Sequence, residues 1–344
     1  MKNNNPIISV IVANYNGELF IKDCISSILK EKNDYELIVV DDYSTDNSVH
    51  VIKKLQTNYP NIHLIENSIN LGAAKSRNIG AKKSRGEILF FLDCDTTTQK
   101  GWYTKIISFF KKYSDAGLAQ AKILRTNTNS FDYAGDLINS LGFLSERAHG
   151  VEDRGQFDKV EPIFSLKGAA MITRNSIFQK VGGFDEEYGY YWEEPDFAWR
   201  VWLSGSKVYF VPQVVVFHEY VTKNKDFHYY ARNDIIFKSS KNAIATQIKN
   251  LGTKNIGIIL PIHVLSWFIL ACALLFKVDL WKSYSIFKGI VWNFIHLNST
   301  LIKRKNIQNT RKISDKDLFQ IVGKKQSVIY YFLKGISYIL GKPY

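Results

Sequence analysis

Apolar and polar residues follow a repeating order through the first hundred residues of the chain. Four apolar runs lie within residues 7–14, 35–42, 62–68 and 87–95, and each run ends in polar residues. Between these runs, apolar residues recur at helical spacing. Such runs are typical of buried strands, and the spaced pattern is typical of helices that cover a sheet. The order therefore predicts an α/β fold with a mostly parallel sheet flanked by helices.

Polar clusters follow three of the predicted strands. In an open parallel sheet ligands bind beyond the carboxyl ends of the strands, so we expect these clusters to converge. Two carboxylates one residue apart could bind a hard divalent cation, or the first could cap a helix while the second is solvated. An aromatic ring and a carboxylate at neighbouring strand ends could stack on a nucleobase and bind its polar edge. The clusters are Asn14 with Tyr15, Asp41 with Asp42, and Asp93 with Asp95.

The pattern is less regular in residues 125–165, which are rich in Gly, Asp and aromatic residues. This composition is typical of a long functional loop or a small ordered insert. A strand, a helix and a Gly-Gly turn are predicted within residues 165–189. Asp196 and Arg200 follow one helical turn apart and are expected to pair. A last apolar strand ends at His218.

The C-terminal third differs in charge and in hydrophobicity. The formal net charge of +13 is concentrated in residues 221–344, which contain 20 Lys and Arg against 5 Asp and Glu. The aromatic residues there lie in apolar runs rather than between basic residues, which argues against a nucleic-acid-binding protein. Ile256–Phe276 contains no Asp, Glu, Lys or Arg and is long enough to span a bilayer.

The uncharged segment is open to three interpretations. It could cross a bilayer, with a weaker apolar segment from Tyr284 returning the chain. Both segments could instead lie in the membrane interface. They could also form a helical hairpin packed on the preceding domain, for which Pro261 and His263 inside the segment argue. Because basic residues near the segment would be attracted to anionic headgroups, we expect attachment to the cytoplasmic face of the membrane.

Six motifs in a fixed order show a family resemblance across about residues 6–220. The motifs are SVIVANYNG, ELIVVDDYSTDNS, NLGAAKSRNIGAKKSRGEILFFLDCDT, GAAMITRNSIFQKVGGFDE, WEEPDFAWR and VPQVVVFHE. With these motifs the chain resembles the family 2 glycosyltransferases, which are inverting enzymes with the GT-A fold. Within that family, the order of its C-terminal segments is similar to that of bacterial rhamnosyltransferase-type enzymes that extend cell-surface polysaccharides.

The resemblance implies a nucleotide site. Ala13 and Tyr15 are expected beside the nucleobase, and Asp42 is expected to bind its polar edge. Arg77 matches a basic residue near the diphosphate, unless it is only a solvated charge on a helix. Asp93 is expected to reach the ribose, or the metal through water. Which base and which sugar are bound stays open.

The resemblance also implies a divalent cation, Mn²⁺ or Mg²⁺. Asp95 matches the carboxylate that binds the metal directly, and His218 matches a histidine that completes the metal site in many relatives. The alternative is that His218 is structural. Negative charge builds up on the β-phosphate as the glycosidic bond breaks, and a cation stabilises that charge. A nitrogen ligand favours Mn²⁺.

Inversion requires a base that takes the proton of the attacking hydroxyl group. Glu194 aligns with the second acid of the family's Glu-Asp pair. Because a glutamate in place of that aspartate reaches one methylene further, Glu193 stays a second candidate. The alternative is that both acids only favour the start of a helix. Gly168 and Ala169 match the segment that lines the donor sugar and the acceptor, although close packing of a strand on a helix would also require small residues.

The resemblance implies an inverting glycosyltransferase. It would move a sugar from a nucleotide-diphosphate sugar to a hydroxyl of a glycan acceptor, expected to be lipid-linked, by metal-assisted single displacement. The alternative is a membrane-associated protein that binds nucleotide sugars without catalysis. Glu194, Asp95 and His218 are present, which argues against that alternative. The acceptor and the linkage stay open.

The pattern and the resemblance together predict two domains. Residues 1–225 are expected to form the GT-A catalytic domain, with a nucleotide-sugar half at about 6–97 and an acceptor half at about 98–225. Residues 226–344 are expected to form a basic, helical, membrane-associated region around the apolar segment 256–276.

Overall fold

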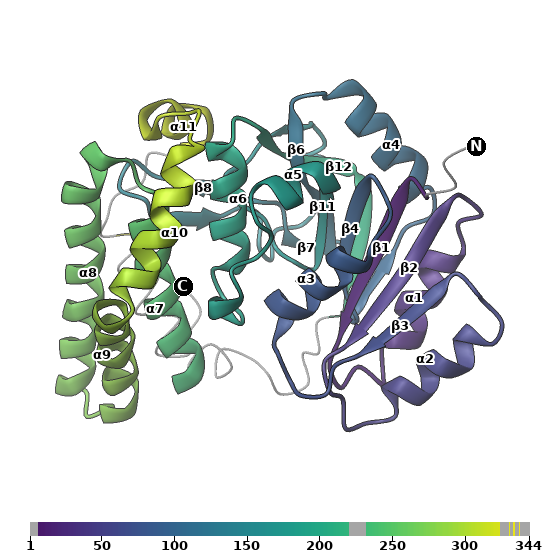
Figure 1. Cartoon of the computed structure of the whole chain (residues 1–344), viewed down its shortest axis with the longest axis horizontal. Helices are drawn as coiled ribbons and strands as arrows, with labels where there is room; N and C mark the ends of the chain where they lie inside the picture. The colour runs from purple at the N-terminus through teal and green to yellow at the C-terminus, as the bar shows by residue number, and fades with distance from the viewer. Residues whose placement is uncertain (1–5, 220–231, 324–329, 331–332, 334–336, 338–344) are drawn as a thin grey trace. The chain divides into compact units, whose positions relative to one another are not determined.

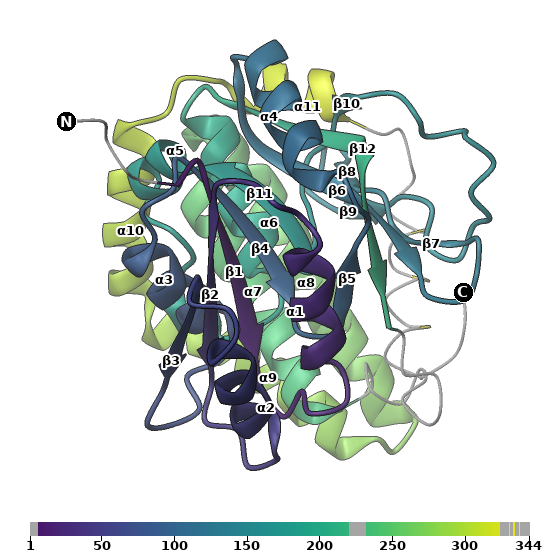
Figure 2. The ribbon, with the colours of Figure 1, turned by 90° about the vertical axis from the view of Figure 1, so that its right-hand side faces the viewer.

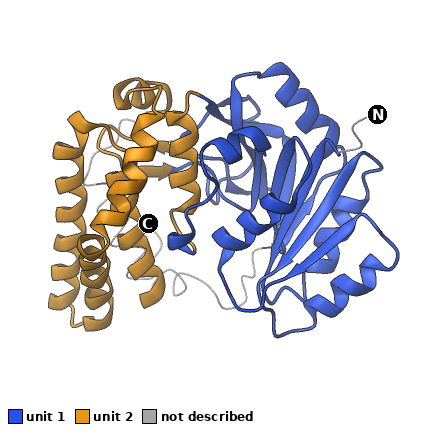
Figure 3. Cartoon of the chain, in the orientation of Figure 1, with its two compact units in different colours: residues 1–136, 146–189, 206–220 blue, residues 137–145, 190–205, 221–344 orange. Residues whose placement is uncertain are grey.

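The computed structural model of the chain describes residues 6–219 and 232–323, together with residues 330, 333 and 337. These residues belong to two compact units (Figure 3). The first unit contains residues 1–136, 146–189 and 206–220, and the second contains residues 137–145, 190–205 and 221–344. The domain boundary predicted at residue 225 lies outside the described residues.

Four parallel strands form one half of the main sheet in the first unit, in the order β4-β1-β2-β3. They are the four apolar runs of the sequence, and each of β1, β2 and β3 is followed in the chain by a helix that returns it to the same end of the sheet (Figure 2). The elements are β1 (Ile8–Asn14), α1 (Ile21–Leu29), β2 (Tyr35–Asp41), α2 (Ser48–Gln56), β3 (Ile62–Glu66), α3 (Ala73–Lys83) and β4 (Ile88–Asp93).

The sheet continues beyond β4 with strands of both directions. β11 (Ala170–Arg174) lies antiparallel between β4 and β6 (Ala116–Arg125), and β12 (Lys207–His218) runs parallel to β6. Three short strands pair antiparallel with these: β5 (Thr96–Thr98) and β10 (Glu161–Pro162) with β12, and β7 (Phe131–Tyr133) with β6. The predicted α/β fold is confirmed, and the antiparallel strands make the sheet a mixed one.

Residues 125–165 form an ordered insert rather than one long loop. Besides β7 and β10 they contain the paired strands β8 (Asp136–Ile138) and β9 (Leu144–Glu146). The remaining helices of the first unit are α4 (Trp102–Lys112), α5 (Asn175–Lys180) and the 3₁₀ turn η1 (Glu186–Tyr188).

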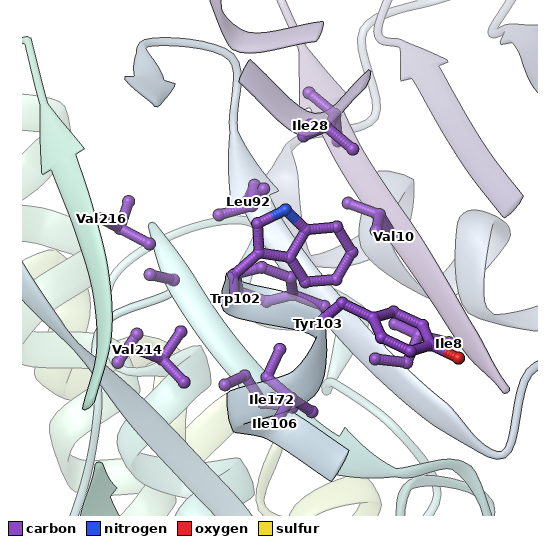
Figure 4. Packing of buried hydrophobic residues seen from close by; sticks show 14 of the residues in the cluster. Ile8, Val10, Ile28, Leu92, Trp102, Tyr103, Ile106, Ile172, Val214 and Val216 are labelled. Carbon is purple, nitrogen blue, oxygen red and sulfur yellow. The ribbon is translucent and has the colours of Figure 1, made fainter. Parts of the chain in front are cut away.

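Trp102, on α4, is at the centre of the core between this helix and the sheet. Its ring is fully buried and lies 5.5 Å, centroid to centroid, from both Tyr35 and Phe90. Ile106, one turn further along α4, is buried with it among Val10 and other strand residues (Figure 4). Burial of an aromatic side chain of this size contributes several kcal/mol, so this packing holds α4 on the sheet.

Between residues 190 and 323, the described part of the second unit consists mostly of six helices. The central one is α7, which packs against α6, α8, α9 and α10 (Figure 1). The predicted apolar segment forms one continuous helix, α8, with Pro261 inside it. The helices are α6 (Glu193–Leu203), α7 (Asn233–Asn250), α8 (Thr253–Phe276), α9 (Leu280–Ile295), α10 (Leu297–Asn309) and α11 (Asp315–Val322).

A buried ion-pair cluster holds α6 to α7. The predicted pair of Asp196 with Arg200 is confirmed at 2.9 Å. Lys249 and Asn250 of α7 each bind the other carboxylate oxygen of Asp196, also at 2.9 Å. Because a buried carboxylate is tolerated only when it is paired, these contacts fix the position of the helix that begins with Glu193.

Candidate active site

The register of the sheet brings the three predicted polar clusters to one edge. Asn14 at the end of β1 lies opposite Asp41 at the end of β2, and Ala13 lies opposite Asp93 at the end of β4. Because the three strands are parallel and in register, their carboxyl ends are level. The sequence therefore placed these residues correctly at one sheet edge.

A hydrogen-bond network shapes the loop after β1. The side-chain amide of Asn14 donates to Oδ1 of Asp41 at 2.6 Å, and the backbone N–H of Ser44 donates to Oδ2 of the same carboxylate at 2.9 Å. Ala13 is half-buried, while the ring of Tyr15 is 53% exposed. These hydrogen bonds fix the loop, and the ring of Tyr15 stays exposed to solvent at the strand ends.

Asp42 is buried and shapes the segment that leads into α3. Oδ1 accepts hydrogen bonds from Asn67 and from the backbone N–H of Leu71, and Oδ2 accepts one from the N–H of Gly72, at 2.7–2.9 Å. A carboxylate has about four acceptor positions, so one remains for a further donor. The contact of Asp42 with a nucleobase stays a prediction.

The buried Arg77 forms an ion pair with the half-buried Asp93 at the strand ends. Their side chains are 2.8 Å apart, and Arg77 is only 3% exposed, so its interpretation as a solvated helix charge is wrong. Asp93 does not cap a helix either, because β5 follows it. The pair orients the Asp93 carboxylate at the sheet edge, and a contact of Arg77 with a diphosphate stays a prediction.

Gly168 lies directly against this ion pair. A methyl group at its Cα would clash with the guanidinium group of Arg77. The carbonyl of Ala169, which is fully buried, lies 3.4 Å from the backbone N–H of Asp93. Close packing therefore accounts for both small residues, and a role for them in lining the sugar stays a prediction.

Strand pairing brings His218 to Asp95. β5 follows the two aspartates at once and pairs with the end of β12, so that Thr96 lies opposite His218. Nε2 of His218 is 3.3 Å from Oδ1 of Asp95, and the N–H of Glu219 donates to the carbonyl of Asp95 at 2.9 Å. Strand pairing thus brings together a carboxylate oxygen and an imidazole nitrogen, two possible metal ligands, from residues more than one hundred positions apart.

The charges around His218 favour its cationic form in the free protein. Burial by itself lowers the pKa of the imidazole, but hydrogen bonds to Asp132 and Asp95 raise the pKa to about 9. Nδ1 of His218 donates to Oδ2 of Asp132 at 2.9 Å. Asp132 lies on β7, in the segment whose sequence showed no regular pattern, so sequence reasoning missed it.

Asp95 and His218 are suited to a cation that is bound partly by the protein and partly by its substrate. Among the described residues there is no group of three or more His, Cys, Asp and Glu side chains arranged as a complete metal cage. Cations that bind nucleotides commonly take one or two protein ligands and complete their coordination with phosphate oxygens. An oxygen and a nitrogen donor 3.3 Å apart match that smaller requirement.

The two candidate bases open α6 in the second unit. Glu193 is buried and Glu194 is half-buried. The two residues before them, Tyr191 and Trp192, have positive φ angles of 64° and 70°. Asn242 of α7 donates to the carbonyls of Tyr190 and Tyr191 and so holds this turn. A strained turn of this kind is often found at functional sites, and the letters YYW did not indicate it.

Comparison with known proteins identifies the family. A sequence model described as Glycosyl transferase family 2 matches residues 9–182, just over half of the chain. The putative teichuronic acid biosynthesis glycosyltransferase TuaG of Bacillus subtilis is 32% identical over 117 residues, which are 34% of this chain and 46% of that protein. The matches span less than half the length of the first curated relatives.

Solved structures show the same fold. S. aureus TarS 1–349 in complex with UDP-GlcNAc has a TM-score of 0.58 and 17% identity, over 91% of each chain. The mannosyltransferase PcManGT from Pyrobaculum calidifontis, in complex with GDP-Man and Mn²⁺, has a TM-score of 0.54 and 13% identity, over 98% of this chain and 86% of that chain. At these identities the likeness establishes the fold alone, which is the GT-A fold that the motifs implied.

Proposed function

Because the chain belongs to glycosyl transferase family 2, we propose that it moves a sugar from a nucleotide-diphosphate sugar to a hydroxyl group of a glycan acceptor, with inversion at the anomeric carbon. The observation that carries this proposal is the meeting of Asp95 and His218, 3.3 Å apart at the carboxyl end of β4. Ligands bind at this end of the strands in open α/β sheets.

Asp95 and His218 would hold a divalent cation at this point. The cation would stabilise the negative charge that develops on the departing diphosphate. The imidazole nitrogen favours Mn²⁺ over Mg²⁺, because nitrogen ligands suit transition metals better. The structural relative PcManGT is in complex with Mn²⁺, which supports the same choice here.

The residues at the ends of β1 and β2 would bind the nucleotide. The exposed ring of Tyr15 would stack on the base, with Ala13 beside it. Asp42 would accept one further hydrogen bond, from the base edge. Arg77 would hold Asp93 toward the ribose and add positive charge near the diphosphate.

Glu194 would act as the base. The acceptor oxygen bonds to the anomeric carbon on the face opposite the diphosphate, the bond from that carbon to the diphosphate oxygen breaks with its electron pair on the diphosphate, and the acceptor proton passes to the Glu194 carboxylate. Glu194 is half-buried whereas Glu193 is buried, and this greater exposure supports Glu194 as the residue that would meet an acceptor. Gly168 and Ala169 would lie beside the donor sugar and the acceptor.

Release of nucleoside diphosphate tests this proposal. The purified chain is incubated with Mn²⁺, a panel of UDP-, GDP- and dTDP-sugars, and glycan acceptors with and without a lipid carrier. We expect release of nucleoside diphosphate from one donor class, dependent on acceptor and abolished by EDTA. Absence of release with every donor, combined with tight donor binding, would favour a protein that binds nucleotide sugars without catalysis.

The acceptor would be a lipid-linked glycan at the cytoplasmic face of the membrane. The relative TuaG is named as a teichuronic acid biosynthesis glycosyltransferase, which supports a polymer acceptor. In this chain, α8 is long and apolar enough to cross a membrane by length and composition. However, one face of α8 packs against α7 and α9, so we favour a helix that lies in the membrane interface.

Exposed apolar residues on α8 and α9 support contact with lipid. On α8, Ile258, Leu265 and Ile269 recur at helical spacing on the exposed side, and α9 exposes Trp281 and Phe294. Residues 253–309 contain seven Lys and Arg and a single acid, Asp279. An apolar face with aromatic residues and a basic surround matches an anionic lipid surface.

Replacing Phe276, Trp281 and Phe294 with serine is expected to weaken binding to anionic vesicles at least tenfold. Each is more than two-thirds exposed, so its loss costs little stability. Each buried aromatic side chain contributes about 1.5–3 kcal/mol on transfer from water, and tenfold in affinity is about 1.4 kcal/mol. Co-sedimentation with vesicles that contain or lack anionic lipid measures the effect.

A control variant carries three serines in the first unit instead, at Leu19, Tyr59 and Ile69, which are also exposed. It should sediment with vesicles as the wild type does. If the two triple variants lose binding equally, or if neither does, the α8–α9 face is not the lipid-binding surface.

A further inference from the structure

A buried carboxylate outside the recognised motifs contacts the proposed metal ligand. Asp132 on β7 has a side chain with no solvent exposure. Its Oδ2 atom accepts hydrogen bonds from Nδ1 of His218 at 2.9 Å and from Nζ of Lys167 at 2.6 Å. One oxygen thus binds two cationic groups that come from β12 and from the segment before β11.

The geometry orients the imidazole ring. With Nδ1 bound to Asp132, Nε2 of His218 faces Asp95 at 3.3 Å. A histidine that binds a metal through one ring nitrogen commonly donates its other N–H to a carboxylate, which fixes the ring and makes the free nitrogen a better ligand. The chain Asp132–His218–Asp95 has that arrangement.

Asp132 is kept in place at a cost in stability. Its other oxygen, Oδ1, is buried and has no hydrogen-bond partner among the described residues; Nδ1 of His149 lies 3.9 Å away. An unsatisfied buried acceptor costs about 1–3 kcal/mol. The charge of the carboxylate is used by its other oxygen, Oδ2, which binds both His218 and Lys167.

We propose that Asp132 is the positioning residue of the metal site, which holds His218 with Nε2 toward the cation and balances the charge of Lys167 beside it. This inference rests on the proposed function, because it assumes that His218 binds a metal. Asp132 itself does not touch the cation or the substrate. It acts by setting the orientation and the basicity of the His218 imidazole ring.

The test measures Mn²⁺ binding by the full chain without donor or acceptor. Titration followed by the electron paramagnetic resonance signal of free Mn²⁺ gives the dissociation constant, and electron spin-echo modulation from ¹⁴N reports whether a histidine nitrogen binds the ion. Asp132→Asn is expected to raise the dissociation constant roughly 10–100-fold, the range found for outer-shell partners of metal ligands. It is also expected to weaken the ¹⁴N modulation, which a merely structural residue would not change.

Two further variants serve as references. His218→Gln should lose the ¹⁴N modulation altogether. Asp136→Asn makes the same substitution at a carboxylate with little exposure four residues away, which accepts from Ser165 rather than from His218. It should bind Mn²⁺ as the wild type does.

If Asp132→Asn does not fold, the double variant Asp132→Asn/Lys167→Met removes the unbalanced cation, and Lys167→Met alone is its reference. If the double variant has the same Mn²⁺ affinity and the same ¹⁴N modulation as Lys167→Met, or if Asp132→Asn matches the wild type in both, Asp132 does not position His218. Either result would leave the metal proposal intact. Failure of the wild type to bind Mn²⁺ would overturn both.

Discussion

Replacing Asp95 with alanine is expected to lower the rate of sugar transfer about 1,000-fold while the protein stays folded. Asp95 supplies the oxygen of the proposed donor pair, and its side chain is 31% exposed, so its removal leaves no buried cavity. A bound cation contributes several kcal/mol to stabilising charge in a transition state. Since 1.36 kcal/mol corresponds to a factor of ten in rate, loss of about 4 kcal/mol gives the stated change.

The rate of nucleoside diphosphate release across a range of Mn²⁺ concentrations measures this effect. The thermal unfolding temperature should shift by no more than a few degrees. Asp115→Ala is the matched control, because this aspartate is also partly exposed but precedes β6, at the opposite end of the strands. Activity of Asp95→Ala close to that of Asp115→Ala would rule out Asp95 as a metal ligand.

Glu194→Gln is expected to reduce kcat roughly 10²–10⁴-fold, the contribution typical of a general base. Glutamine has nearly the same shape but cannot take up the acceptor proton at neutral pH. The Kd for the donor should stay unchanged, because the proposed nucleotide contacts involve other residues. Single-turnover rates and donor binding, measured separately, distinguish a lost base from a lost binding contact.

Glu193→Gln provides the comparison for the base. Both variants change one carboxylate at the start of α6, but Glu193 is buried and is expected to affect stability more than kcat. If Glu193→Gln abolishes turnover and Glu194→Gln does not, the base is Glu193. If neither substitution lowers kcat by more than a few fold, the two acids only favour the start of the helix.

The residues of the proposed nucleotide site could be predicted because the pattern that indicates them lies within short stretches of the sequence. Each of β1, β2 and β4 is an apolar run that ends in polar residues, and parallel strands bring such ends to one edge. Asp42 and Asp93 could therefore be placed without coordinates. Their actual partners could not: the loop before α3 binds Asp42, and Arg77 binds Asp93, through contacts that no spacing encodes.

The position of His218 was inferred from a motif, and its physical cause appears only in the fold. The three-residue strand β5 pairs with the end of β12 and brings the histidine to Asp95. Strand pairing over such a separation depends on the whole sheet. The role of Asp132 could not be predicted from the sequence, since an aspartate in an irregular segment is more often a surface residue than a buried partner of a histidine.

The sequence by itself determined the family, the four parallel strands of the first unit with the helices between them, the polar residues at the strand ends, and a basic C-terminal region with one long apolar helix. These depend on composition and periodicity along short stretches, which local physics translates directly into structure. The tertiary structure alone decided the antiparallel direction of β11, the packing of Gly168 on Arg77, and the chain of contacts from Asp132 through His218 to Asp95. Burial, charge pairing and ring orientation arise from residues that are distant in sequence, so they exist only once the sheet has formed.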